Sequence, residues 1–289
     1  MVITANLPRW MSRSCGALAI AGLVVLLPTL KLSASVLVSP TVVFVTDKNP
    51  TGRMTLMNLG DKDMEVNIHF SFGLPVSDSL GKVRVVFQDS AVTDPRSALD
   101  WIRAFPRTVI IAPGASQTVR IMARPPGGLP DGEYWARIMV RSQAVANKVP
   151  RAGRADEIVT HLNMIMQTAI MFKYRTGDLV SNLELVGATA TLEDTTVTVM
   201  IDLENRGNVS YMGVLQCWLR DNQGNEVDFY RANIAVYRGM RRRVDLSGIT
   251  TEDKLPFTVE FRISSEERTD VAATDMIVGN KISYSVAVE

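Results

Sequence analysis

From residue 36 to the end of the chain, short segments rich in β-branched and aromatic residues alternate with turn residues. Residues 63–72 are typical, because their apolar side chains recur at every second position. Turn residues such as 205–208, Asn-Arg-Gly-Asn, separate these segments. The one credible helix covers residues 94–102, with Asp94 as its cap. About seven strands per hundred residues is typical of a β-sandwich, so the sequence predicts an all-β fold.

The length of 289 residues is sufficient for two domains of ordinary size. The strand-and-turn pattern begins again after the turn at Thr176, Gly177 and Asp178. We therefore expect two β-sandwich domains in tandem, at residues 36–175 and 176–289.

The N-terminus has the pattern of a secretory signal peptide. Arg9 and Arg13 precede an apolar core at residues 16–30, and small residues follow at 33–35. An uncleaved anchor helix is the alternative, although a proline and a lysine interrupt the apolar run. We expect residues 1–35 to be removed, which would leave an exported chain that starts at Val36 and has no membrane anchor.

Composition argues against several classes of function. The 31 basic and 30 acidic residues balance, so no overall field favours nucleic acid. After signal cleavage the chain would keep one cysteine, Cys217, and two histidines, His69 and His161. This is a poor inventory for a metal site or a catalytic triad. We expect no metal, no cofactor and no enzymatic activity; an esterase or glycosidase on a β scaffold is a minor alternative.

Two segments carry the candidate functional residues. Arginines at positions 238 and 241–243 could grip an acidic partner, or could simply protect a solvated strand edge. Residues 162–175 alternate like a strand but exceed the usual length of ~5–6 residues. The surplus length is available to a partner, unless its side chains all face their own core. The residues on the apolar face are Leu162, Met164, Met166, Ile170, Phe172 and Tyr174.

The first predicted domain resembles the periplasmic chaperones of chaperone–usher pilus assembly, or a divergent secreted relative of them. The order and spacing of several blocks carry this resemblance more than any single block does. The final block, residues 162–175, resembles the long edge strand and interdomain hinge of that family. The blocks before it are residues 36–44, residues 54–59, Phe105-Pro106-Arg107, Ala112-Pro113-Gly114 and residues 129–135.

The resemblance implies immunoglobulin-like domains, a periplasmic location and a role in fimbrium biogenesis and cell wall organization. Such a chaperone lends a strand to a subunit whose own sheet is incomplete. The implied subunit-binding residues are Leu162, Met164, Met166 and Ile170, and the loop at 143–156 would order on contact. The implied partners are pilus or other β-rich subunits and an outer-membrane usher. A non-catalytic structural or adhesive envelope protein, built from the same modules, is the alternative.

The resemblance also identifies two sets of charged residues. The family anchors a subunit's terminal carboxylate with an arginine and a lysine, but Thr41 and Met171 stand at those positions. Lys173 is the nearest substitute for the anchor. Arg175 matches a hinge arginine, and the resemblance implies an interdomain ion pair between Arg175 and Glu133.

Overall fold

The computed structural model describes residues 36–88, 93–145, 164–249 and 256–289. The expected signal peptide at 1–35 lies outside the described residues. The described residues form strands, with two short 3-10 turns at Leu99–Trp101 (η2) and Ala273–Asp275 (η3). The expected all-β fold of two sandwiches is confirmed. No helix in the described ranges is both long and apolar enough to cross a bilayer.

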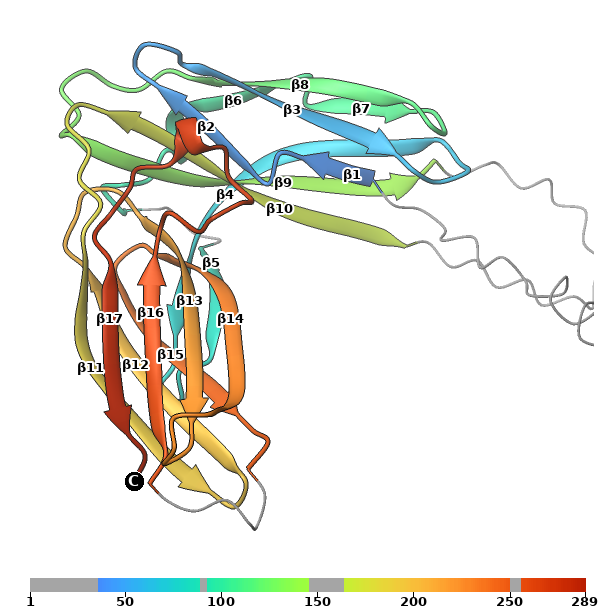
Figure 1. Cartoon of the computed structure of the whole chain (residues 1–289). Helices are drawn as coiled ribbons and strands as arrows, with labels where there is room; N and C mark the ends of the chain where they lie inside the picture. Colours follow the sequence, from blue (N-terminus) through green and yellow to red (C-terminus); the bar gives the residue numbers. More distant parts are fainter. Residues whose placement is uncertain (1–35, 89–92, 146–163, 250–255) are drawn as a thin grey trace, which may run out of the picture.

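The first sandwich packs two sheets against each other (Figure 1). Alternate apolar residues of both sheets are buried between them, among them Leu56, Val66 and Ile138. One sheet has the order β1 (Val36–Ser39), β3 (Thr51–Asn58), β8 (Ser116–Ala123) and β6 (Ile102–Phe105). The other has the order β2 (Val42–Thr46), β10 (Ile165–Thr176), β9 (Gly132–Ala144), β4 (Met64–Ser77) and β5 (Val83–Gln88), with β7 (Thr108–Ile111) beside β4.

The second sandwich has the same construction. Its core contains Val199, Leu215 and Phe261, together with Cys217, whose burial raises the pKa of its thiol to about 12. One sheet has the order β11 (Leu183–Glu193), β12 (Thr196–Asn205) and β15 (Gly239–Leu246). The other has the order β14 (Glu226–Val236), β13 (Tyr211–Arg220), β16 (Thr258–Ser264) and β17 (Ile282–Ala287).

The predicted helix at residues 94–102 is wrong except for the short turn η2. Backbone pairing with β9 takes its place, because the Trp135 N–H donates to the Arg96 carbonyl and the Ala98 N–H donates to the Trp135 carbonyl, both at 2.8 Å. Asp94 caps a turn here, where its carboxylate accepts the Arg96 N–H at 2.9 Å. A local capping signal has therefore been overridden by bonds to a distant strand.

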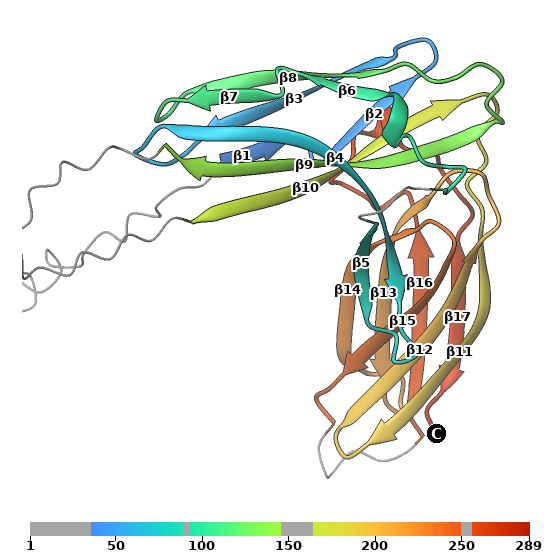
Figure 2. The ribbon, with the colours of Figure 1, turned by 180° about the vertical axis from the view of Figure 1, so that it is seen from behind.

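The β4–β5 hairpin connects the two sandwiches. It leaves the first sandwich and runs beside the second, as both ribbon views show (Figures 1 and 2). Its tip bonds to the edge of β15, where the Arg243 N–H donates to the Gly81 carbonyl at 3.2 Å and the Arg241 N–H donates to Ser77 Oγ at 2.8 Å. Val83 packs against the second core. The hairpin thus covers part of a sheet edge that would otherwise be open.

We expect Gly81→Ala to destabilise the protein more than Gly114→Ala does. Both glycines have a positive φ, +73° and +71°, so alanine is strained by ~1–2 kcal/mol at either position. A Cβ at Gly81 would also lie 2.7 Å from the backbone nitrogen of Arg243, whereas a Cβ at Gly114 would meet nothing within 4 Å. Urea denaturation of both variants measures the difference, and equal losses of stability would mean that the hairpin is not held against β15.

Candidate functional site

Strand β10 has one edge that is only partly used. Along its length it pairs antiparallel with β9 on one side. On the other side, β2 pairs with it in parallel, and only from Met171 to Arg175. Among the described residues, no strand pairs with that side of β10 from Ile165 to Ile170. Figure 1 shows this half of β10 extending beyond β2. Its backbone N–H and C=O groups on that side are available to an added strand.

The side chains of β10 divide at the same point. Near its start, Met164, Ile165 and Met166 are 56%, 48% and 40% exposed. Further along, Phe172 and Tyr174 are buried in the first core. Met166, Phe172 and Tyr174 lie on the same side of the strand by their even spacing. This face of β10 is therefore buried in the core near Phe172 and Tyr174 and exposed near Met166.

The residues expected to bind a subunit fall into three groups. Met166 lies on the open half of β10 and Met164 directly precedes this strand, and both side chains are exposed. Ile170 does not belong with them, because it is only 4% exposed and packs in the core of its own sandwich. Leu162 lies outside the described residues, as does most of the loop at 143–156.

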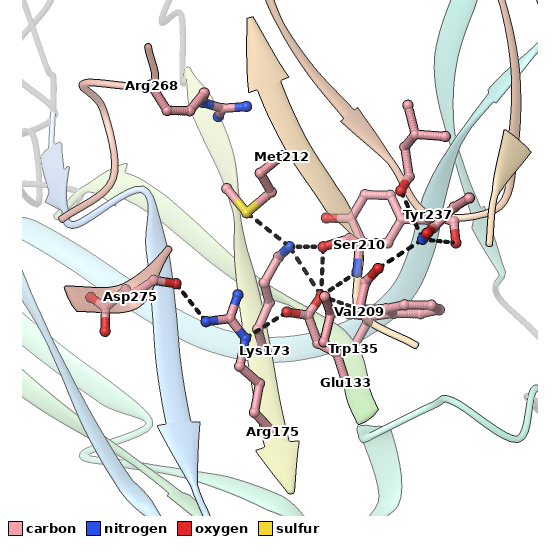
Figure 3. A network of polar contacts seen from close by, with 12 residues as sticks. Glu133, Trp135, Lys173, Arg175, Val209, Ser210, Met212, Tyr237, Arg268 and Asp275 are labelled. Atoms are coloured by element: carbon pink, nitrogen blue, oxygen red, sulfur yellow. Dashed lines mark hydrogen bonds and ion pairs between the residues drawn. The ribbon is translucent and has the colours of Figure 1, made fainter. Parts of the chain in front are cut away.

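Glu133 is the centre of a buried polar cluster between the sandwiches (Figure 3). Its carboxylate lies 2.8 Å from Arg175 Nε and 3.1 Å from Lys173 Nζ. It also accepts hydrogen bonds at 2.6 Å from the indole N–H of Trp135 and from the hydroxyl of Ser210. Of the four groups that contact Glu133, three lie on β9 and β10 of the first sandwich. The fourth, Ser210, directly precedes β13 of the second sandwich.

Arg175 and Glu133 do form an ion pair, but they lie opposite each other on β10 and β9 of the first sandwich, so the pair itself is not interdomain as the resemblance implied. The second sandwich adds the hydroxyl of Ser210 and the backbone carbonyl of Asp275, which accepts a hydrogen bond from Arg175 Nη1 at 2.5 Å. The second sandwich thus contributes uncharged acceptors and donors rather than a carboxylate. The sequence carried no signal for these two contributions, because a serine and a backbone carbonyl in loops have no pattern of their own.

Lys173 is not the exposed anchor that the resemblance implied. Its side chain is 1% exposed. The ammonium group donates to Glu133, to the Ser210 hydroxyl and, at 3.3 Å, to the sulfur of Met212. The side chain points away from the core of the first sandwich and is covered there by the second sandwich. No approach remains for a partner's carboxylate, so Lys173 belongs to the hinge.

Charge in this cluster is unbalanced, with two cations for one carboxylate. Burial alone would raise the pKa of Glu133, but Lys173, Arg175 and the Ser210 hydroxyl outweigh it and lower that pKa to about 2. Burial lowers the pKa of Lys173 to about 8, and the attraction of Glu133 only partly opposes this. The negative charge of Glu133 is therefore fully balanced, whereas the positive charge of Lys173 is not.

We expect Lys173→Met to be at least as stable as the wild type at pH 7, because it removes the surplus buried charge. The unfolded lysine keeps its proton up to pH 10.5, but the folded one keeps it only up to about pH 8. The wild type therefore gains stability between these pH values, and the advantage of the variant shrinks. Urea denaturation at pH 7 and pH 10 tests this, with the exposed Lys281→Met as control. A loss of stability above ~1 kcal/mol in Lys173→Met at pH 7 would contradict this expectation, because removing an exposed ion pair costs no more than that.

Three of the four arginines at 238 and 241–243 pair with aspartates of this chain, whereas Arg242 donates to the Tyr230 hydroxyl at 2.6 Å. Arg238 lies 2.7 Å from Asp94, Arg241 lies 2.7 Å from Asp202 and Arg243 lies 2.8 Å from Asp245. The carboxylates of these three aspartates already provide the negative charge that an acidic partner would otherwise supply. This pairing favours the interpretation of the cluster as part of a solvated strand edge.

Within the described ranges, no group of three or more His, Cys, Asp or Glu side chains is placed to hold a metal ion. The candidate site that the structure does offer is the open edge of β10. Its elements are the unpaired backbone of Ile165–Ile170 and the exposed side chains of Met164 and Met166.

Comparison with known proteins gives matches among solved structures alone. No family model matches the chain, and no curated protein sequence matches it. The YadV chaperone is 15% identical, with a TM-score of 0.45 over 87% of this chain and 98% of that one. The Class 5 fimbriae chaperone CfaA is 14% identical, with a TM-score of 0.42 over 87% and 99%.

The E. coli chaperone DraB is 13% identical, with a TM-score of 0.41 over 81% of this chain and 90% of that one. These three structures are chaperones by their descriptions, and the sequence resemblance led us to expect matches of that kind. At such identities and TM-scores they say nothing about what this chain binds, which has to be inferred from the edge of β10.

Proposed function

We propose that this chain is a periplasmic assembly chaperone that holds a β-rich partner, such as a pilus or fimbrial subunit, by lending it the open half of β10. The observation that carries this proposal is the unpaired edge from Ile165 to Ile170 beside the exposed Met164 and Met166. In this proposal residues 1–35 are a signal peptide, and residues 36–175 and 176–289 are the two domains.

The physical basis is β-augmentation. A partner that lacks a strand has an open groove and an unpaired edge, and β10 would supply both backbone bonds and apolar side chains. Methionine side chains are flexible and fit grooves of different shapes, which suits a chaperone with several clients. An outer-membrane usher would then receive the partner from the chaperone. No catalytic step is needed.

The test is the double variant Met164→Asp with Met166→Asp, purified from periplasmic extract together with its client. We expect the wild type to hold a small β-rich protein in a stoichiometric complex and the double variant to lose it, because a buried carboxylate opposes packing in an apolar groove. Leu59→Asp with Ile110→Asp is the matched control, since both residues are exposed apolar side chains of the same sandwich away from β10.

Amide hydrogen exchange gives a second measurement on the same complex. We expect the partner to protect the amides of residues 165–170 and to leave the already paired end of β10 unchanged. A double variant that retains its client, or an absence of protection at 165–170, would reject strand lending. Material that fractionates with the cell surface and has no soluble client would instead indicate an adhesive envelope protein.

A further inference from the structure

The outer face of the sheet that contains β9 and β10 forms one wall of the angle between the sandwiches. Figure 1 shows this sheet on the side of the first sandwich nearest the second. Next to the hinge this wall is apolar, where Trp135 and Met171 pack with Tyr237. Farther from the hinge it becomes polar and contains a pocket of about 520 Å³. The lining residues are Asn67, His69, Arg141 and Gln143.

Arg141 is the charged group of this pocket. Among the described residues no carboxylate lies within 4 Å of its guanidinium group. Arg137, four residues earlier on the same face of β9, is different because its Nε donates to the Gly73 carbonyl at 3.0 Å. The nearby Glu65 carboxylate is bound by the amides of Gln143 at 3.0 Å and Asn67 at 3.4 Å. The wall thus presents a cation that the described part of the chain does not neutralise.

His69 adds a neutral polar group beside this cation. Partial burial and the charge of Arg141 lower the pKa of its imidazole below 6.5. The ring is therefore uncharged at pH 7 and can donate one hydrogen bond. An anion in the pocket would meet a guanidinium fork and an imidazole N–H, a set of donors that suits a carboxylate.

The register of the sheet connects this pocket to the open edge of β10. Asn67, Arg141 and Gln167 lie side by side on β4, β9 and β10. Gln167 is in the middle of the half of β10 that β2 leaves unpaired. A strand added there would place its own residue next in this row, about 10 Å from the backbone of Arg141. The side chains of an arginine and a glutamate together span that distance.

We propose that Arg141 selects partner strands that carry an acidic side chain on the outward-facing position opposite Gln167. This inference rests on the proposed function, because it needs a strand on the open edge of β10. The ion pair would also fix the register of the added strand, since a slip of one residue moves the acidic side chain to the opposite face. Backbone bonds would then hold the partner, and Arg141 would determine which segment of the partner is held.

Synthetic strand peptides provide the test. The probe is a ten-residue peptide of alternating valine and threonine with one outward-facing glutamate, compared with the same peptide carrying glutamine there. We measure binding to the purified chain by fluorescence anisotropy and expect the glutamate peptide to bind about fivefold more tightly. Arg141→Gln should remove this preference and Arg141→Lys should keep part of it. Arg120→Gln, an exposed arginine on the opposite sheet, should leave it unchanged.

The outcomes separate this inference from the proposed function. A glutamate moved to the inward-facing position should give no advantage, because that side of the strand faces away from Arg141. Equal binding of both peptides to the wild type, or a preference that survives Arg141→Gln, would overturn the role of Arg141 and leave strand lending intact. If neither peptide binds the wild type, strand lending itself fails, and the role of Arg141 fails with it.

Discussion

We expect Glu133→Gln to lower the free energy of unfolding by about 3–5 kcal/mol, which is typical when one partner of a buried ion pair is removed. The side chain of Glu133 is fully buried, and it is the only carboxylate within 4 Å of Lys173 or Arg175 in the described part of the chain. A glutamine would keep the shape but leave two buried cations without a counter-charge. Because Ser210 also donates to this carboxylate, the variant should weaken the contact between the sandwiches.

Urea denaturation at pH 7 measures this loss. Glu184→Gln is the control, because Glu184 pairs with Arg206 at the surface, where such pairs contribute at most ~1 kcal/mol. A loss as small as that of the control would mean that the cluster does not stabilise the hinge.

The pH dependence gives an independent check. The pKa of Glu133 is about 2 in the folded chain and 4.5 in the reference state. Its contribution is therefore complete above pH 4.5 and is lost as the pH falls toward 2, where the carboxyl group gains a proton. The stability difference between wild type and Glu133→Gln should shrink over that range. A difference that stays constant down to pH 2 would contradict the assigned role.

The hinge also shows which features of the fold the local sequence does not determine. The alternation of residues 162–175 correctly predicts a strand, because the period of two is a local property. It cannot show what covers each face, since this depends on segments far away in the sequence. Lys173 lies at an outward position, and only the second sandwich makes that position buried. The Glu133–Arg175 pair was implied by a family resemblance and not by any local pattern.

The same limit explains the other differences. Phe172 and Met166 have the same parity on β10, but only Phe172 lies where the first core continues. No local pattern predicted that the β4–β5 hairpin would dock on β15, because that contact joins residues about 160 positions apart. Local signals therefore defined most of the strands, and non-local pairing decided how each of their faces is used.

We expect Phe172→Ala to cost about 3–5 kcal/mol, as large truncations in a core do, and Met166→Ala to cost less than ~1 kcal/mol. Both side chains lie on the same face of β10, six residues apart. Phe172 is fully buried, whereas Met166 is 40% exposed beyond the end of β2. The pair therefore compares the half of β10 that stabilises its own sandwich with the half proposed for a partner.

Urea denaturation of the two variants without a partner measures this contrast. Met166→Ala should then weaken client binding although it leaves stability nearly unchanged, which separates binding from folding. A cost for Met166→Ala close to that for Phe172→Ala would show that the open half of β10 is packed within its own chain. In that case β10 would have no free apolar surface for a client, and strand lending would have to be abandoned.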